Sequence, residues 1–167
     1  MSVFVQRLLL LLLLVVLQHS FLDILWPSLG APVLLIAASI AIVFLTGFAQ
    51  GIGWVVLMVG LSFLLEEMSF FPVFAVGIAY GASFLSRRLR LEDRIQNIVV
   101  LSLVAAFSAL LYRVLLYFFE AVDWTLSLMI WDAALAFLVF PIVFGIIRRH
   151  EEYIKTSLMS EFRGLRS

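Results

Sequence analysis

Cysteine is absent from the 167 residues of this chain. Its absence excludes disulfide bonds, thiolate metal sites, iron–sulfur clusters and cysteine nucleophiles. The glycine-rich motifs Gly-x-x-x-x-Gly-Lys-Ser/Thr and Gly-x-Gly-x-x-Gly are also missing, so the chain encodes no standard cradle for a nucleotide. We therefore expect no cofactor, no metal and no catalytic residue, and a protein that is not an enzyme.

Charge is scarce, because charged residues make up 13% of the chain and apolar residues 65%, with a mean hydropathy of +1.18. A soluble globular protein has about 45–50% apolar and about 25% charged residues. This composition predicts an integral membrane protein whose first partner is the lipid bilayer. The formal net charge is zero, so neither a nucleic-acid partner nor an acidic substrate is indicated.

Six apolar segments approach the length of a membrane-spanning helix. Such a helix needs about 20 mostly apolar residues to cross a hydrocarbon core of about 30 Å. Turn formers or charged residues separate the segments, which cover residues 3–21, 31–46, 50–65, 70–86, 95–119 and 125–147. The predicted fold class is all-α: a polytopic integral membrane protein with a bundle of six transmembrane helices over residues 1–147.

The basic residues are distributed unevenly between the segments. With the N-terminus inside, ten of the eleven fall on cytoplasmic segments: Arg7, the run from Arg87 to Arg94, and the tail from Arg148 onward. The opposite loops carry acids only. Cytoplasmic loops of membrane proteins are enriched in Lys and Arg, so this pattern predicts that both termini are cytoplasmic.

Apart from Arg7, near the start of the first span, Arg113 and Asp132 are the charges that fall inside predicted spans. At 1.5 Å rise per residue both lie roughly 10–14 Å from the outer end of the hairpin formed by the last two helices. Charges at depth usually face a partner or a wet cavity. Three interpretations remain open: an ion pair within the chain, a functional charge facing a partner helix or substrate, and outward snorkelling of Arg113.

Other polar residues near the predicted outer face are candidate contacts for a partner or ligand. Glu66 and Glu67 end the third predicted helix, and they are either solvated acids or contacts. His19, beside Gln18 at the end of the first helix, is a weaker candidate, because such a polar pair is usually hydrated. The second histidine, His150, is predicted on the opposite side, which disfavours both a serine–histidine protease and a histidine metal site.

Two pairs of glycines have the four-residue spacing that lets helix backbones approach closely. Gly47 and Gly51 fall at a predicted turn, which weakens that pair. Gly77 and Gly81 lie inside the fourth predicted helix, and we expect them to be helix-packing residues.

The polar tail over residues 148–167 has a helical repeat of apolar positions with charges between them. This pattern is typical of a helix lying on the cytoplasmic membrane surface. The alternative is that the last transmembrane helix simply continues beyond residue 147.

The first half of the chain carries a specific set of motifs. They are Leu17-Gln18-His19-Ser20-Phe21-Leu22, Pro27, Leu29-Gly30-Ala31-Pro32-Val33-Leu34-Leu35, Gly47, Gly51, Gly53, Gly60-Leu61, Glu66-Glu67 and Arg87-Arg88. With them, the run from Gln18 to Arg88 resembles the rod-shape-determining protein MreD family, which consists of small six-helix proteins of the bacterial inner membrane. Two positions depart from that family: Val33 stands where an Asp or Asn follows the proline, and Glu66 or Glu67 would have to replace an Asp.

The resemblance implies a non-enzymatic scaffold that binds MreC and the elongation machinery containing RodA and a penicillin-binding protein. It also implies a fold similar to the substrate-binding subunits of energy-coupling-factor transporters. Fold alone therefore cannot separate a scaffold from a second hypothesis, a membrane subunit that binds a small molecule such as a vitamin or a metal. Under that alternative, the ligand would lie between helix ends carrying Glu66, Glu67, Arg113 and Asp132.

Overall fold

A computed structural model describes residues 3–25, 31–65, 71–88, 94–120 and 125–164. Of these residues 97% are helical, and none is in a strand. The predicted all-α class is therefore confirmed for the described part of the chain. Glu66 and Glu67 lie outside the described residues.

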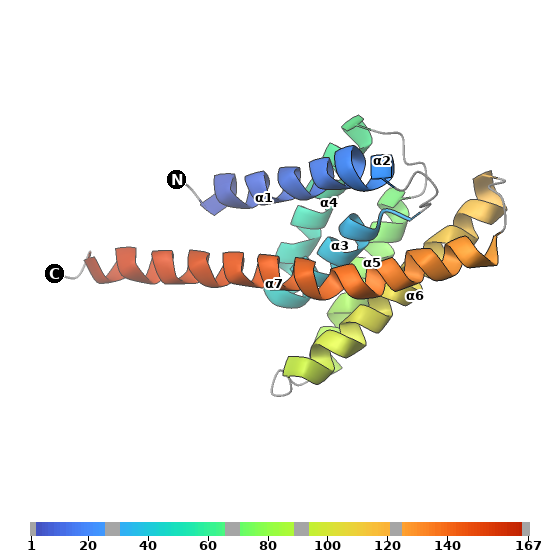
Figure 1. Cartoon of the computed structure of the whole chain (residues 1–167). Helices are drawn as coiled ribbons and strands as arrows, with labels where there is room; N and C mark the ends of the chain where they lie inside the picture. Colours follow the sequence, from blue (N-terminus) through green and yellow to red (C-terminus); the bar gives the residue numbers. More distant parts are fainter. Residues whose placement is uncertain (1–2, 26–30, 66–70, 89–93, 121–124, 165–167) are drawn as a thin grey trace.

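The first helical run, at the N-terminal end of the chain in Figure 1, is α-helical except for one π-helical turn near its end. It consists of α1 (Val3–Leu17), a π-helical turn η1 (Gln18–Leu22) and the short α2 (Asp23–Leu25). The remaining helices are α3 (Val33–Thr46), α4 (Phe48–Leu65), α5 (Phe71–Arg88), α6 (Arg94–Glu120) and α7 (Leu126–Gly164).

Helix α3 is the centre of the fold. Eleven of its 14 residues are buried, on all sides of the helix, as expected of a helix that is apolar all round. It packs against α1, α4, α5, α6 and α7. Several of its residues are alanines, and these small side chains let the surrounding helices approach its backbone closely.

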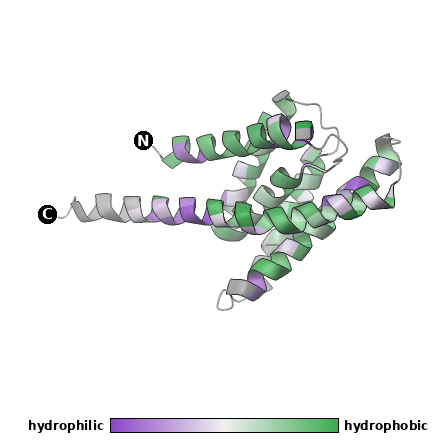
Figure 2. Cartoon of the chain, in the orientation of Figure 1, coloured by the Kyte–Doolittle hydropathy of each residue, from purple (hydrophilic) through white to green (hydrophobic). Residues whose placement is uncertain are grey.

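Many large apolar side chains are exposed on the bundle, and Figure 2 shows that most of its helices are predominantly hydrophobic. Three helical stretches are long and apolar enough to cross a membrane: Val3–Leu22, Gln96–Phe119 and Leu126–Thr156. The apolar helices Val33–Thr46, Phe48–Leu64 and Phe71–Leu85 are shorter. These features are consistent with a helical membrane protein.

Gly47 and Gly51 form the tight corner between α3 and α4. Gly47 has a φ of 81°, which favours glycine because a Cβ would be strained there. A Cβ on Gly51 would lie 2.8 Å from the Cα of Val43, so α4 approaches the α3 backbone at this point. The glycine pair that the sequence analysis discounted is therefore the one at a close helix contact.

Gly77 and Gly81, which are predicted to be helix-packing residues, do not pack against another helix among the described residues. Both glycines are exposed on α5, and a Cβ on either would meet no atom within 4 Å. The reason is that α5 packs on α3 and α4 through its other face.

Helix α7 does not end at residue 147 as predicted but continues through Pro141 to Gly164. Ile147, Glu151 and Ile154 are all at least 92% buried, and their spacing of four and three residues places them on one face. The start of the predicted tail thus packs against its own bundle. This segment is therefore a continuation of the last helix, the second of the two alternatives. The hydrophilic part of α7 lies at the same end of the molecule as the N-terminus (Figure 2).

Candidate functional site

An open groove with a volume of about 570 Å³ lies between α5 and α6. The two helices meet at Phe74 and Tyr112, whose ring centroids are 5.1 Å apart. Otherwise α5 packs on α3 and α4, whereas α6 packs on α7 and α3. We call the space that this leaves the α5–α6 groove. Its lining residues are Val73, Phe74, Gly77, Ile78, Gly81 and Ala82 of α5, and Val104, Phe107, Ser108, Leu111, Leu115 and Phe119 of α6.

The two walls of the α5–α6 groove differ in character. The α5 wall contains Gly77 and Gly81, where the backbone itself is exposed. The α6 wall carries large side chains, of which Phe107 is 68% exposed. Ser108 supplies the one hydroxyl among the twelve lining residues. A smooth backbone wall opposite a wall of bulky side chains is a surface on which another helix can pack.

Arg113 and Asp132 lie together between α6 and α7. Nη1 of Arg113 donates a hydrogen bond to Oδ2 of Asp132 over 3.3 Å, and the two side chains are 7% and 1% exposed. Snorkelling of Arg113 to the headgroups is therefore wrong, because its side chain is turned into the protein. Neither residue lines the α5–α6 groove, so the pair connects two helices of the same chain.

Gln18, His19, Asp23 and Ser62 form a hydrogen-bonded network, called here the Gln18 network. Nε2 of Gln18 donates to Oδ1 of Asp23 at 2.8 Å, while its Oε1 accepts from the backbone N–H of Leu34 at 2.9 Å. The second bond caps the start of α3, where the N-cap residue offers no side-chain bond of its own. Gln18 is fully buried, so the interpretation of this polar pair as hydrated is wrong.

His19 contributes both ring nitrogens to the Gln18 network. Nδ1 lies 3.0 Å from Oδ2 of Asp23 and Nε2 lies 2.8 Å from Oγ of Ser62. A Ser–His–Asp chain of this kind activates a serine in hydrolases, but a nucleophile must also reach its substrate. Ser62 is 1% exposed, so we assign the network a structural role. His19 is engaged within the chain, where its side chain is 9% exposed, and its contact with a partner or ligand stays a prediction.

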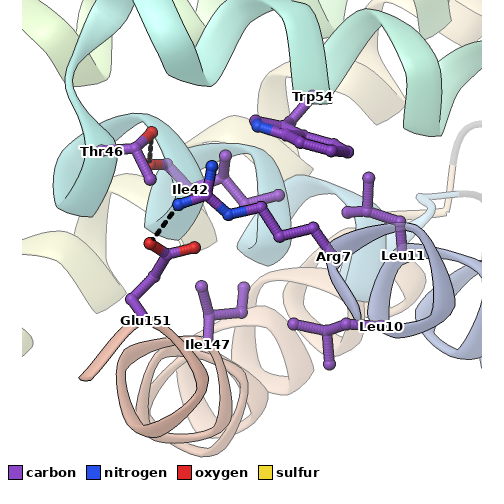
Figure 3. A pocket seen from close by; sticks show the side chains of 8 residues that line it. All are labelled: Arg7, Leu10, Leu11, Ile42, Thr46, Trp54, Ile147 and Glu151. Carbon is purple, nitrogen blue, oxygen red and sulfur yellow. Dashed lines mark hydrogen bonds and ion pairs between the residues drawn. The ribbon is translucent and has the colours of Figure 1, made fainter. Parts of the chain in front are cut away.

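Arg7 of α1 extends between Glu151 of α7 and Trp54 of α4, as Figure 3 shows. Its Nη2 donates to Oε2 of Glu151 at 2.5 Å, and its guanidinium lies 5.5 Å from the ring centroid of Trp54. A small cavity of about 20 Å³ borders this contact and is also lined by Thr46. That volume is about the size of one water molecule. We call this contact the Arg7–Glu151 bridge.

No family model, curated protein or solved structure matches the chain. The resemblance to the MreD family therefore stays a prediction from the residues that carry it. Within the described residues, no group of three or more His, Asp or Glu side chains is arranged to hold a metal ion.

Three features of the structure escaped the sequence analysis. Glu151 lies in the predicted polar tail, although its spacing of four from Ile147 continues the buried face of α7 and is the signal that identifies it. Gln18 carried no such signal, because its role depends on the start of α3, which is distant in sequence. The sequence contains no signal for the α5–α6 groove either. A groove forms where two helices do not pack against each other, and this depends on the arrangement of the whole bundle.

Proposed function

We propose that this chain is a non-enzymatic scaffold subunit of the bacterial cell-wall elongation machinery. In this proposal the α5–α6 groove binds the single transmembrane helix of an MreC-like partner, and the scaffold acts beside RodA and a penicillin-binding protein. The groove is the observation that carries the proposal. The resemblance of residues 18–88 to the MreD family gives the groove its candidate occupant.

The dimensions and chemistry of the groove support a helix as its occupant. On the α6 side the lining runs from Val104 to Phe119, which at 1.5 Å per residue is about 22 Å of helix. Eleven of the twelve lining residues are apolar or glycine, so the groove suits a lipid-soluble helix better than a polar vitamin or a metal ion. Exposed glycine backbone allows such a helix to approach closely.

The proposed topology has six membrane crossings with both termini in the cytoplasm. The three long apolar stretches, the three shorter apolar helices and the distribution of basic residues support it. The shorter helices suit a locally thinned bilayer. Attaching a reporter enzyme that is active only in the cytoplasm to either terminus tests this directly, and an inactive reporter at either end would contradict the topology.

The partner is tested by purification with a tagged single-span, coiled-coil MreC-like protein from the same organism. We expect the two to purify as a complex, and Gly81→Leu to reduce its yield at least tenfold because leucine fills the groove. Gly60→Leu is the matched control: Gly60 is also exposed, a Cβ there meets nothing within 4 Å, and it lies outside the groove. Equal yields from both variants, or no complex with the wild-type chain, would contradict the proposal.

A further inference from the structure

Ser108 differs from the other buried serines in the described part of the chain. Ser39, Ser83 and Ser102 each donate a hydrogen bond to a backbone carbonyl of their own helix, and Ser62 is bonded to His19. Ser108 is 8% exposed and lines the α5–α6 groove, yet its hydroxyl has no hydrogen-bond partner among the described residues.

The depth of Ser108 in the membrane makes a hydroxyl without a hydrogen-bond partner energetically unfavourable. The apolar stretch of α6 runs from Gln96 to Phe119, and Ser108 lies at its middle. If α6 crosses the bilayer, the hydroxyl opens into the groove near the centre of the hydrocarbon, where lipid tails offer neither a donor nor an acceptor. A hydroxyl without a hydrogen-bond partner is unfavourable there, because the hydrocarbon contains no water to bond to it.

The exposed glycine wall lies at the same level as Ser108. Phe74 of α5 contacts Tyr112 of α6, and the two helices run in opposite directions, since α5 descends and α6 rises in Figure 1. One turn onward from Phe74 is Gly77, and one turn back from Tyr112 is Ser108. The hydroxyl and the exposed glycine backbone therefore face the groove at one depth.

We propose that the groove selects a partner helix carrying a hydrogen-bonding side chain, such as Asn, Gln, Ser or Thr, at its midpoint, where it bonds to Ser108. This inference rests on the proposed function, since it names a feature of the helix that the groove binds. A lipid tail can fill the apolar volume but cannot satisfy the hydroxyl. A helix can do both, because its small face packs on Gly77 and Gly81 while a polar side chain reaches Ser108.

The test uses three synthetic single-span peptides of leucine and alanine, each with the same Ala-x-x-x-Ala face. The first carries Asn at the midpoint of that face, the second Leu at the same place, and the third Asn on the opposite face. The full chain, labelled at a cysteine introduced by Thr125→Cys, is reconstituted in phosphatidylethanolamine–phosphatidylglycerol vesicles. Binding of labelled peptide is measured by energy transfer.

We expect the first peptide to bind roughly threefold to tenfold more tightly than the other two, in line with hydrogen bonds between membrane helices. Ser108→Ala should abolish this preference, whereas Ser108→Thr, which retains a hydroxyl, should preserve it. Gly81→Leu should weaken the binding of all three peptides, and Gly60→Leu should leave their binding unchanged.

The outcomes separate this inference from the proposed function. A preference for the first peptide that persists in Ser108→Ala overturns the inference and leaves helix docking in place. Failure of every peptide to bind, or binding that Gly81→Leu does not affect, overturns both. Energy transfer is also measured between two labelled copies of the chain. If it occurs and Gly81→Leu abolishes it, the groove binds a second copy, and the inference is overturned.

Discussion

Arg7 in the first helix and Glu151 in the last form an ion pair across 144 positions of sequence. Trp54 lies against the same guanidinium, so the contact also includes α4. The side chains of Arg7 and Glu151 are 19% and 11% exposed, which leaves the pair largely screened from solvent. A single charged contact thereby links α1 and α7 and lies against α4.

Glu151→Ala should lower the free energy of unfolding by about 1–3 kcal/mol, because it leaves the charge of Arg7 buried without its acceptor. Thermal unfolding in detergent measures the change. Glu152→Ala is the matched control: Glu152 pairs with Arg148, but its side chain is 59% exposed, and exposed pairs contribute about 0–1 kcal/mol. Equal destabilisation by both variants would contradict a special role for the Arg7–Glu151 bridge.

Arg113→Ala and Asp132→Ala should each reduce the yield of folded protein strongly. Each leaves one buried charge without its partner, a change that costs about 3–5 kcal/mol in buried pairs. The double variant Arg113→Asp with Asp132→Arg restores opposite charges and should recover part of the yield, as judged by size-exclusion chromatography in detergent. The interpretation fails if both single variants behave like the wild-type chain and the double variant is worse than either.

Gln18→Leu should destabilise the chain by about 1–3 kcal/mol, because it leaves the N–H of Leu34 and the carboxylate of Asp23 without their hydrogen bonds to Gln18. Leucine has a similar volume, so the effect reports the polar atoms. Gln50→Leu is the control, since Gln50 is exposed at the start of α4. Hydrogen exchange at the first turn of α3 should accelerate in the Gln18 variant and not in the control, and unchanged exchange would argue against the capping role.

Gly51→Ala should destabilise the chain by about 1–3 kcal/mol, because the added Cβ meets the backbone of Val43 at 2.8 Å and one of the two helices must shift. Gly53→Ala places the same methyl group where nothing lies within 4 Å, and alanine is the better helix former. We therefore expect Gly53→Ala to be neutral or slightly stabilising in the same melting experiment. A reversed order would contradict the close approach of α3 and α4.

The positions of the middle helices could be predicted from the sequence. The four predicted segments from 31–46 to 95–119 end within two residues of the helices α3, α4, α5 and α6, because apolar runs bounded by Gly, Pro or charges determine local structure. The end of α7 could not be located in this way. Charged residues after residue 147 signal exposure, but burial of Ile147, Glu151 and Ile154 on one face keeps the helix against the bundle.

The candidate site was far less accessible to sequence reasoning. Equal depth on consecutive helices was enough to suggest that Arg113 and Asp132 meet. The spacing of Gly77 and Gly81 indicated a helix-packing surface, but not that the chain itself leaves that surface open. Nothing in the sequence distinguishes Ser108 from Ser102. The hydroxyl of Ser102 bonds to a carbonyl of its own helix, whereas that of Ser108 does not.

The unbroken length of α7 has a mechanical consequence. From Asp132, where α7 is paired to α6, to Gly164 the helix is about 48 Å long at 1.5 Å per residue, and its far end extends beyond the other helices (Figure 1). A tilt of about 5° around Asp132 would displace that end by about 4 Å at this length. The Arg7–Glu151 bridge lies between Asp132 and that far end, so it would oppose such a tilt.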